Sequence, residues 1–159
     1  MRSATCRFFA VLTVLAVAAA CNPTTTATRA DLQLYLQHAN DWAPVEAETA
    51  RTIGRILATQ FVDEAEVRRQ ITADQPRVAD HVARIGAVHP TSDEVREIHR
   101  QYVETWTRLA RGYDDILRGL DHGQAADLAA GRESLEAWRD GIVSTARQLR
   151  HLQDDLGSL

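Results

Sequence analysis

The sequence predicts an all-α protein: an antiparallel up-down-up-down four-helix bundle behind a cleaved N-terminal signal. Four segments carry apolar residues at helical spacing, and short connections with capping residues separate them. No segment shows the period-two alternation that a half-buried strand requires. The chain has 159 residues, enough for one domain with a substantial core, and we expect the bundle over residues 30–159.

The third predicted helix, over residues 93–120, carries the most regular apolar pattern. Two tracks run along it, each with a spacing of seven residues: Val95, Tyr102, Leu109 and Ile116, and then Trp106, Tyr113 and Leu120. Together they form one broad apolar stripe on a helix about 28 residues long, roughly 42 Å. The capping box Thr91-x-x-Glu94 is expected to start this helix, and Gly123 is expected to end it.

The first predicted helix, over residues 30–61, contains a proline. Pro44 cannot donate the helical hydrogen bond to Asn40, so either a kink or a restart capped near residues 40–41 is expected. Both alternatives are compatible with the apolar pattern on either side.

The second predicted helix opens at the capping box Asp63-x-x-Glu66 and ends near Gly86. Pro76 interrupts it, and Asp74 is placed to cap a restart. The linker to the third helix then follows.

The last predicted helix, over residues 124–156, has a coiled-coil-like repeat. Its apolar residues recur every seven positions, with a partner track beside them: Leu128, Leu135, Ile142, Leu149 and Leu156, and Trp138, Thr145 and Leu152. A repeat of seven favours near-parallel packing with a shallow left-handed crossing.

The charge of the chain argues against nucleic acid as a partner. It contains 18 Lys plus Arg, all of them Arg, against 22 acidic residues, for a net charge of −4. A mildly acidic domain without a basic stripe is poorly suited to a phosphate backbone.

Residues 1–20 have the three parts of a secretory signal peptide. Arg2 and Arg7 supply the charged leader, residues 8–20 form a run that is apolar except for Thr13, and small residues precede the expected cut. Spanning a bilayer takes about 20 apolar residues, so this run is too short for a comfortable transmembrane anchor. The sequence therefore predicts export.

The sequence Ala18-Ala19-Ala20-Cys21 resembles the lipobox of bacterial lipoprotein precursors. The resemblance implies cleavage before Cys21, acylation of its thiol, and attachment to lipid of the bacterial cell membrane or outer membrane. It covers residues 1–21 and concerns location, not activity. An ordinary signal peptidase also cleaves after Ala-x-Ala at the same bond, which would leave Cys21 as an exposed thiol able to link two chains.

Residues 21–29 are predicted to be the lipidated cysteine followed by a Thr-rich tether. The tether, residues 22–29, contains one proline and is expected to be extended. At about 3.3 Å per residue it reaches at most ~26 Å, so the folded domain should lie close to the lipid surface.

The sequence lacks the local motifs of several catalytic classes. No histidine has an acid three residues before it, as di-iron bundles require, and Cys-x-x-Cys-His is absent. There is no Gly-rich phosphate loop and no Gly-x-Ser-x-Gly elbow. We therefore assign no catalytic residue and no cofactor, and we do not expect an enzyme.

Five of the six histidines are predicted to gather at the end of the bundle that carries the N-terminus. His38, His81, His99 and His151 lie near helix ends that meet there, with His89 in the adjoining connection. Imidazoles beside carboxylates can bind Zn²⁺ or Cu²⁺, or titrate together as a pH sensor. Polar residues also collect at helix ends without forming a site, so no metal is assigned and the first four are candidate ligands only.

Three tryptophans fall near mid-height of three predicted helices. Trp42, Trp106 and Trp138 can line a pocket for an apolar ligand or simply form core. The large area that an indole buries favours core.

The sequence favours a lipid-anchored, non-enzymatic binding or scaffold module at a bacterial cell envelope. Its expected partners are membrane lipid, through acylated Cys21, and an envelope protein bound on an exposed helix face or on the two proline-containing helices. The alternative is a membrane-proximal metal-binding or pH-sensing bundle that uses the histidines. An exposed apolar patch would favour the first function, and convergent His and Asp side chains would favour the second.

Overall fold

The computed structural model describes residues 23–59 and 61–158, and these ranges form four helices and no strand. The helices are α1 (Pro23–Ala58), α2 (Glu64–Gly86), α3 (Asp93–His122) and α4 (Ala125–Gly157). α3 packs most extensively on α4 and next on α2, while α1 contacts all three others; within these ranges α2 and α4 do not meet, so they lie diagonally. The predicted four-helix bundle is confirmed.

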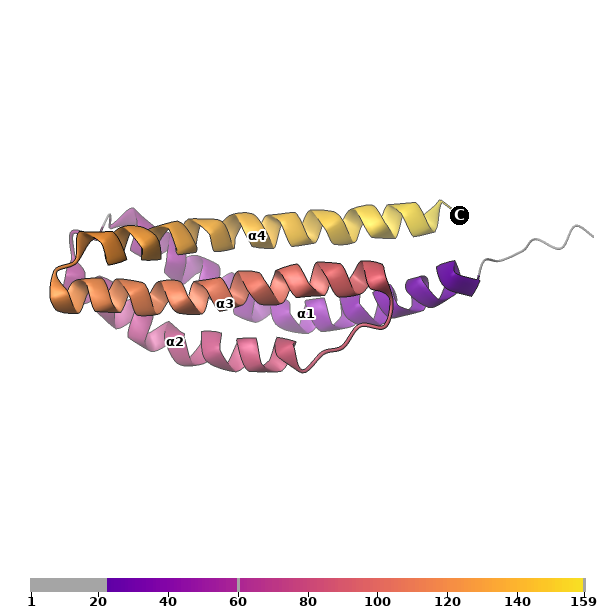
Figure 1. Ribbon diagram of the computed structural model, residues 1–159, viewed down its shortest axis with the longest axis horizontal. Coiled ribbons are helices and arrows are strands. Elements are labelled where there is room, and N and C mark those ends of the chain that lie inside the picture. Colours follow the sequence, from indigo (N-terminus) through magenta and orange to yellow (C-terminus); the bar gives the residue numbers. More distant parts are fainter. Residues whose placement is uncertain (1–22, 60, 159) are drawn as a thin grey trace, which may run out of the picture.

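The two ends of the bundle carry different connections. The start of α1, the α2–α3 connection and the end of α4 lie at one end, which we call the N-terminal end (Figure 1). The α1–α2 and α3–α4 connections lie at the other, which we call the far end. Gly123 closes the α3–α4 turn in the left-handed conformation, with φ of 64°, as its position predicted.

The apolar stripe of α3 is the centre of the core. Both predicted tracks are buried as far as Ile116, and only the last residue, Leu120, is half-buried. Trp106 and Tyr113 are fully buried, with an exposed fraction of 0%. The seven-residue spacing therefore identified the face of α3 on which the other helices pack.

α3 and α4 approach each other closely at glycines, which the apolar pattern did not reveal. A Cβ added at Gly131 of α4 would lie 2.4 Å from Ile116 Cγ1 and 2.8 Å from the carbonyl oxygen of Gly112. A Cβ added at Gly112 of α3 would lie 2.4 Å from Ser134 Cβ. The two backbones therefore come closer than any larger side chain permits.

The prediction of an extended tether is wrong for residues 23–29, which form the first turns of α1. Thr28 is buried, and the Arg29 guanidinium donates to the carbonyl oxygen of Leu156 near the end of α4. The segment packs on the bundle, and a helix satisfies its backbone groups where an extended segment against the protein would leave them without partners.

Of the two predicted capping boxes, the Asp63 cap is observed, with Glu66 turned to Arg69 and Gln70, and the box at Thr91 is wrong. The Asp63 side chain accepts a hydrogen bond from the Glu66 N–H at 3.0 Å. Ser92 precedes α3 but makes no side-chain capping bond to it. The Asp31 carboxylate of α1 accepts instead from the N–H groups of Thr91, at 3.1 Å, and Ser92, at 2.9 Å. An acid on another helix therefore caps the start of α3.

Neither proline divides its helix. α1 is continuous through Pro44 and α2 through Pro76, and both prolines are exposed. On the solvent face, water can satisfy the carbonyl that each proline leaves without a donor. The predicted restart at Asp74 is therefore wrong, and this residue is instead a buried carboxylate inside α2.

Gly131→Ala is expected to lower the free energy of unfolding by about 1–3 kcal/mol relative to Gly54→Ala. Both substitutions gain a similar helix propensity of about 1 kcal/mol. Gly54 is the matched control, because it is exposed in α1 and a Cβ there meets nothing within 4 Å. Urea unfolding followed by circular dichroism measures both variants, and equal unfolding free energies would contradict the close α3–α4 contact.

Candidate functional site

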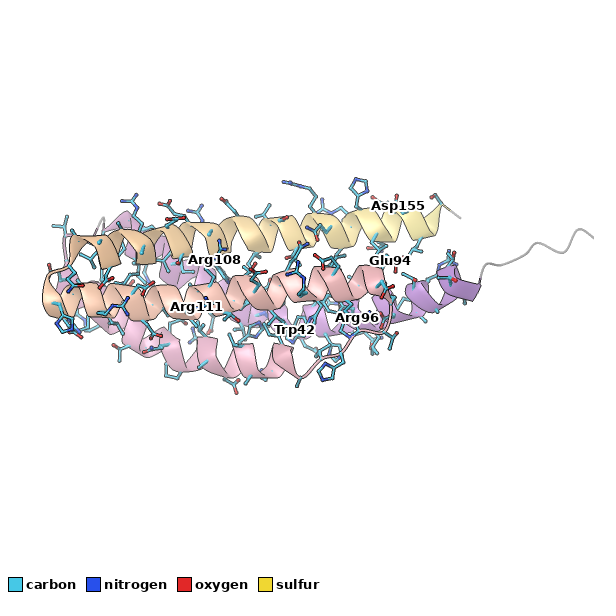
Figure 2. All side chains as sticks on the ribbon, viewed as in Figure 1. Trp42, Glu94, Arg96, Arg108, Arg111 and Asp155 are labelled. Carbon is cyan, nitrogen blue, oxygen red and sulfur yellow. The ribbon has the colours of Figure 1, made fainter. Side chains whose placement is uncertain are left out.

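Three of the four candidate histidines converge on one indole. The ring centroids of His38, His81 and His99 lie 5.8, 6.1 and 6.4 Å from that of Trp42. Trp42 projects from α1 into the interior between α1, α2 and α3 (Figure 2). We call these four residues the histidine cluster. The imidazoles come together because each packs against the Trp42 ring, and not because they point at one shared metal position.

A chain of hydrogen bonds sets the protonation of His81. The Tyr102 hydroxyl donates to Glu46 Oε1 at 2.6 Å, so its oxygen is left to accept from His81 Nε2 at 3.1 Å. Neutral His81 therefore carries its proton on Nε2, and its buried Nδ1 has no hydrogen-bond partner among the described residues. A second proton there would create a buried charge without an acceptor, and burial lowers the pKa of His81 to about 4.

The pKa of Glu46 shifts in the opposite direction to that of His81. Burial raises the pKa of its carboxyl group, and the hydrogen bond from Tyr102 partly opposes that change. A buried acid and a buried base are therefore joined through one tyrosine hydroxyl, and burial favours the neutral form of each.

His99 joins α3 to α1 through one ring nitrogen. Nδ1 lies 3.2 Å from the Tyr35 hydroxyl. Burial lowers the pKa of His99, while the nearby backbone of Val88 and Ile85 acts against that shift. His99 thus lies where α3 meets α1 and the end of α2.

The structure offers no ligand set for a metal within the described ranges. No group of three or more His, Cys, Asp or Glu side chains there is placed to share an ion. His151, the fourth candidate, is exposed on α4 with Nδ1 3.9 Å from an oxygen of Asp155. His89 is exposed in the α2–α3 connection.

The tryptophans form core. Trp106 and Trp138 are 0% and 1% exposed, with ring centroids 5.2 Å apart and edges against faces. Trp42 stacks on Tyr102 at 5.2 Å. Each indole therefore packs against another aromatic ring, which favours a role in the hydrophobic core over a pocket for an apolar ligand.

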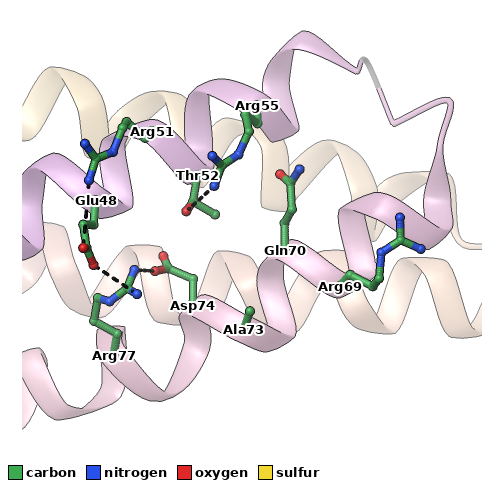
Figure 3. A pocket seen from close by; sticks show the side chains of 9 residues that line it. All are labelled: Glu48, Arg51, Thr52, Arg55, Arg69, Gln70, Ala73, Asp74 and Arg77. Atoms are coloured by element: carbon green, nitrogen blue, oxygen red, sulfur yellow. Dashed lines mark hydrogen bonds and ion pairs between the residues drawn. The ribbon is translucent and has the colours of Figure 1, made fainter.

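A second buried polar group lies nearer the far end. Asp74 is 2% exposed, and its carboxylate accepts from the Tyr113 hydroxyl at 2.8 Å and from Arg77 at 2.5 Å. The other terminal nitrogen of Arg77 lies 3.0 Å from Glu48 of α1 (Figure 3). Arg77 therefore bridges an acid on each of α1 and α2.

A cleft of about 390 Å³ opens beside this group, between α1 and α2 (Figure 3). Its lining consists of Glu48, Arg51, Thr52 and Arg55 from α1, and Arg69, Gln70, Ala73, Asp74 and Arg77 from α2. Four guanidinium groups against two carboxylates give this lining a formal charge of +2, whereas the whole chain carries −4. We call this hollow, with the residues that line it, the arginine cleft.

Sequence analysis missed the arginine cleft. In the sequence its arginines occupy the polar faces of two separate helices, which is where solvated charges are expected. Only the packing of α1 on α2 places them around one hollow.

Cys21, the predicted lipidation site, and the predicted signal, residues 1–20, lie outside the described residues. In the part of the chain that is described, no helix is both long and apolar enough to cross a membrane. No protein-family model matches the chain, and comparisons with curated proteins and with solved structures gave no significant match.

The free energy of unfolding should fall as the pH is lowered from about 6.5 to 4. His81 takes up a proton near pH 6.5 when unfolded but, with its pKa lowered to about 4, only near pH 4 when folded. Protons therefore favour the unfolded chain in this window, by up to about 3 kcal/mol for such a shift. Glu46, whose pKa is raised, works in the opposite direction because it protonates more readily when folded.

Denaturant titrations at several pH values, with wild type and His81→Phe, measure this effect. The variant keeps a ring in the core but cannot titrate, so its stability should fall less on acidification. An identical pH dependence in the two proteins would count against the assigned state of His81, as would a ring titration near pH 6.5 by NMR.

Asp74→Ala should lower the free energy of unfolding by about 2–4 kcal/mol, because the Tyr113 hydroxyl and Arg77 lose their buried acceptor. Tyr113→Phe removes one hydrogen bond and should cost about 1 kcal/mol. Asp80→Ala, at an exposed position of the same helix, is the matched control and should stay within about 0.5 kcal/mol of wild type. Thermal and urea unfolding measure all three, and an Asp74→Ala effect as small as the control would contradict the buried network.

Proposed function

We propose that this protein is an exported, lipid-anchored binding module of a bacterial cell envelope, without catalytic activity of its own. The observation that carries the proposal is the sequence Ala18-Ala19-Ala20-Cys21 at the end of a charged and apolar leader. It favours an acylated N-terminal cysteine, with membrane lipid as one partner.

The position of α1 supports close attachment to the membrane. α1 begins at Pro23, two residues after Cys21, so little chain separates the acylated residue from the folded domain. A helix of 36 residues is ~54 Å long, and the far end of the bundle is therefore separated from the anchored end by about that length.

The surface supports a polar ligand over an apolar partner. The exposed large apolar side chains of the described ranges are Leu34 on α1, Val62 in the α1–α2 connection and Val143 on α4. They lie on three different elements, and single exposed apolar residues are ordinary on protein surfaces. The arginine cleft lies between the two proline-containing helices and is a concave, charged surface, which is suited to binding.

The chemistry of the cleft also supports binding over catalysis. Guanidinium groups stay protonated at neutral pH and cannot act as general bases. The carboxylate of Asp74, which also lines the cleft, is already occupied by Tyr113 and Arg77. The histidines that could move protons, His81 and His99, are buried and hydrogen-bonded to tyrosines.

A second candidate function is a pH-responsive bundle near the membrane. It is favoured by the hydrogen-bonded chain from His81 through Tyr102 to Glu46, which joins α2, α3 and α1. Protonation of His81 would place a charge against Trp42 and Trp106, so acidification would loosen this part of the core.

Fatty-acid labelling of growing cells tests the proposed anchor. Wild type should incorporate the label, and Cys21→Ser should not, because the thiol that carries the acyl chain is gone. Cys6→Ser is the matched control: it changes the other cysteine, which leaves with the signal, and labelling should persist. An unlabelled wild-type protein, with an intact mass that shows unmodified Cys21, would refute the anchor.

A further inference from the structure

We infer that the arginine cleft binds a small hydroxylated organic anion, held by Arg51 and Arg55 of α1. The inference deepens the proposed binding function by naming a site and a class of ligand. The recognised chemistry is an oxyanion, a carboxylate or a phosphate ester, together with a hydroxyl group.

The first observation is that the α1 arginines keep unused hydrogen-bond donors. Among the described residues, the nearest carboxylate oxygen to Arg51 belongs to Glu48, at 3.9 Å, and Arg55 has a single hydrogen bond, to the Thr52 hydroxyl at 3.4 Å. Arg100 on α3 shows the contrasting arrangement, since its guanidinium holds Glu97 with two bonds of 2.9 and 2.7 Å. A guanidinium has five N–H donors in a planar fork that matches an oxyanion.

The second observation is that both acids of the cleft are already in contact with an arginine. Arg77 contacts both Asp74 and Glu48, one with each terminal nitrogen. The other three arginines of the lining bring its formal charge to +2, so the cleft attracts an anion although it contains two carboxylates. The spacing of four residues between Arg51 and Arg55 places both on one face of α1.

The third observation is an acceptor without a donor. Gln70 Oε1 is buried and has no hydrogen-bond partner among the described residues, while its amide nitrogen is held by Glu66. Figure 3 shows the Gln70 side chain extending from α2 toward α1, with the Arg55 guanidinium turned toward Thr52. A rotation of the Gln70 side chain would expose this oxygen to the cleft, where a ligand hydroxyl can donate to it, which is why a hydroxylated anion fits better than a bare one.

The size of the cleft fits a small solute. A hollow of about 390 Å³ falls at the lower end of the range for small-molecule sites. Thr52, 5% exposed, places a hydroxyl in the lining beside Arg55. A polyanion would need a long basic stripe, and the acidic chain does not provide one.

The position of the cleft favours a soluble anion over a lipid headgroup. Arg51 and Arg55 lie 28 and 32 residues after the start of α1, roughly 42 and 48 Å along its axis. With an anchor at Cys21 and the helices directed along the membrane normal, the cleft stands that far from the headgroups of the anchoring membrane. Only this choice of source depends on the proposed function; the site itself does not.

Isothermal titration calorimetry of the mature protein, extracted from its membrane into a neutral detergent, tests the inference. The probes are citrate and glycerol 3-phosphate, with glucose as the uncharged comparison and phosphatidylglycerol vesicles as the headgroup comparison. We expect saturable 1:1 binding of at least one soluble anion with a Kd below about 1 mM, and none of glucose.

Variants locate the site. Arg55→Gln should weaken binding about tenfold, and Arg55→Lys by less, because a lysine keeps the charge but not the fork. Arg111→Gln is the matched control: it removes the same charge from an exposed position on α3, which contributes no residue to the cleft, and the affinity should be unchanged. Arg51→Gln supplies an independent second variant, and circular dichroism confirms that each is folded.

Three results would overturn the site. They are no saturable heat with either anion up to about 10 mM, an equal loss of affinity in Arg111→Gln, or binding of phosphatidylglycerol vesicles alone. The mass of Cys21 in the same preparation separates the two proposals. An unmodified cysteine with intact anion binding would refute only the anchor, whereas an acylated chain that binds no anion would refute only the site.

Discussion

The close contact of α3 with α4 sets the geometry of the whole bundle. Gly112 and Gly131 bring the two backbones together on one side of the α3 stripe, and α1 and α2 then cover the other side. α1 makes far fewer contacts with α2 than α4 makes with α3. Side chains with polar ends can therefore stand between α1, α2 and α3, and this is where the histidine cluster, the buried Asp74 and the arginine cleft all lie. The closely packed α3–α4 side of the bundle has a regular apolar pattern, whereas the more loosely packed side around α1 and α2 carries the buried polar groups.

Tyrosine hydroxyls organise that more loosely packed side. Each of the three tyrosines buries its ring in the core and hydrogen-bonds to an ionisable side chain of another helix: Tyr35 to His99, Tyr102 to Glu46 and His81, and Tyr113 to Asp74. A shift of one helix by a single turn would break these bonds and leave buried groups without partners, at about 1–3 kcal/mol each. Apolar contacts tolerate such a shift more readily, so the hydroxyl contacts specify the register of α1 and α2 against α3.

Most of the fold followed from periodicity, while most of the candidate site did not. The seven-residue tracks of α3 and α4 predicted which residues face the core, because an apolar stripe on a long helix has only one face to cover, although Leu128, Ile142 and Leu152 of α4 are only half-buried. The cap at Asp63 was predictable because the side chain and the N–H group it accepts from belong to one turn. The cap of α3 was mispredicted because Asp31, some 60 residues away in the chain, reaches the same N–H groups. Asp74 was mispredicted as a cap because its partner Tyr113 lies on another helix. The arginine cleft depends entirely on how α1 packs on α2. Of the histidines expected to gather, His38, His81 and His99 surround Trp42, whereas His151 stays apart on the surface of α4. Which atoms they meet depends on side chains of three helices, which periodicity does not show.

The first turns of α1 also bear on how the protein would respond to force. Arg29 contacts the end of α4 and Asp31 contacts the start of α3, at the seventh and ninth residues of α1. Under the proposed anchor, a pull applied at the first residues of α1 and directed along its axis would load these contacts and the packed side chains together, as in shear, instead of breaking them one after another. The bundle would then respond to such a force as one body.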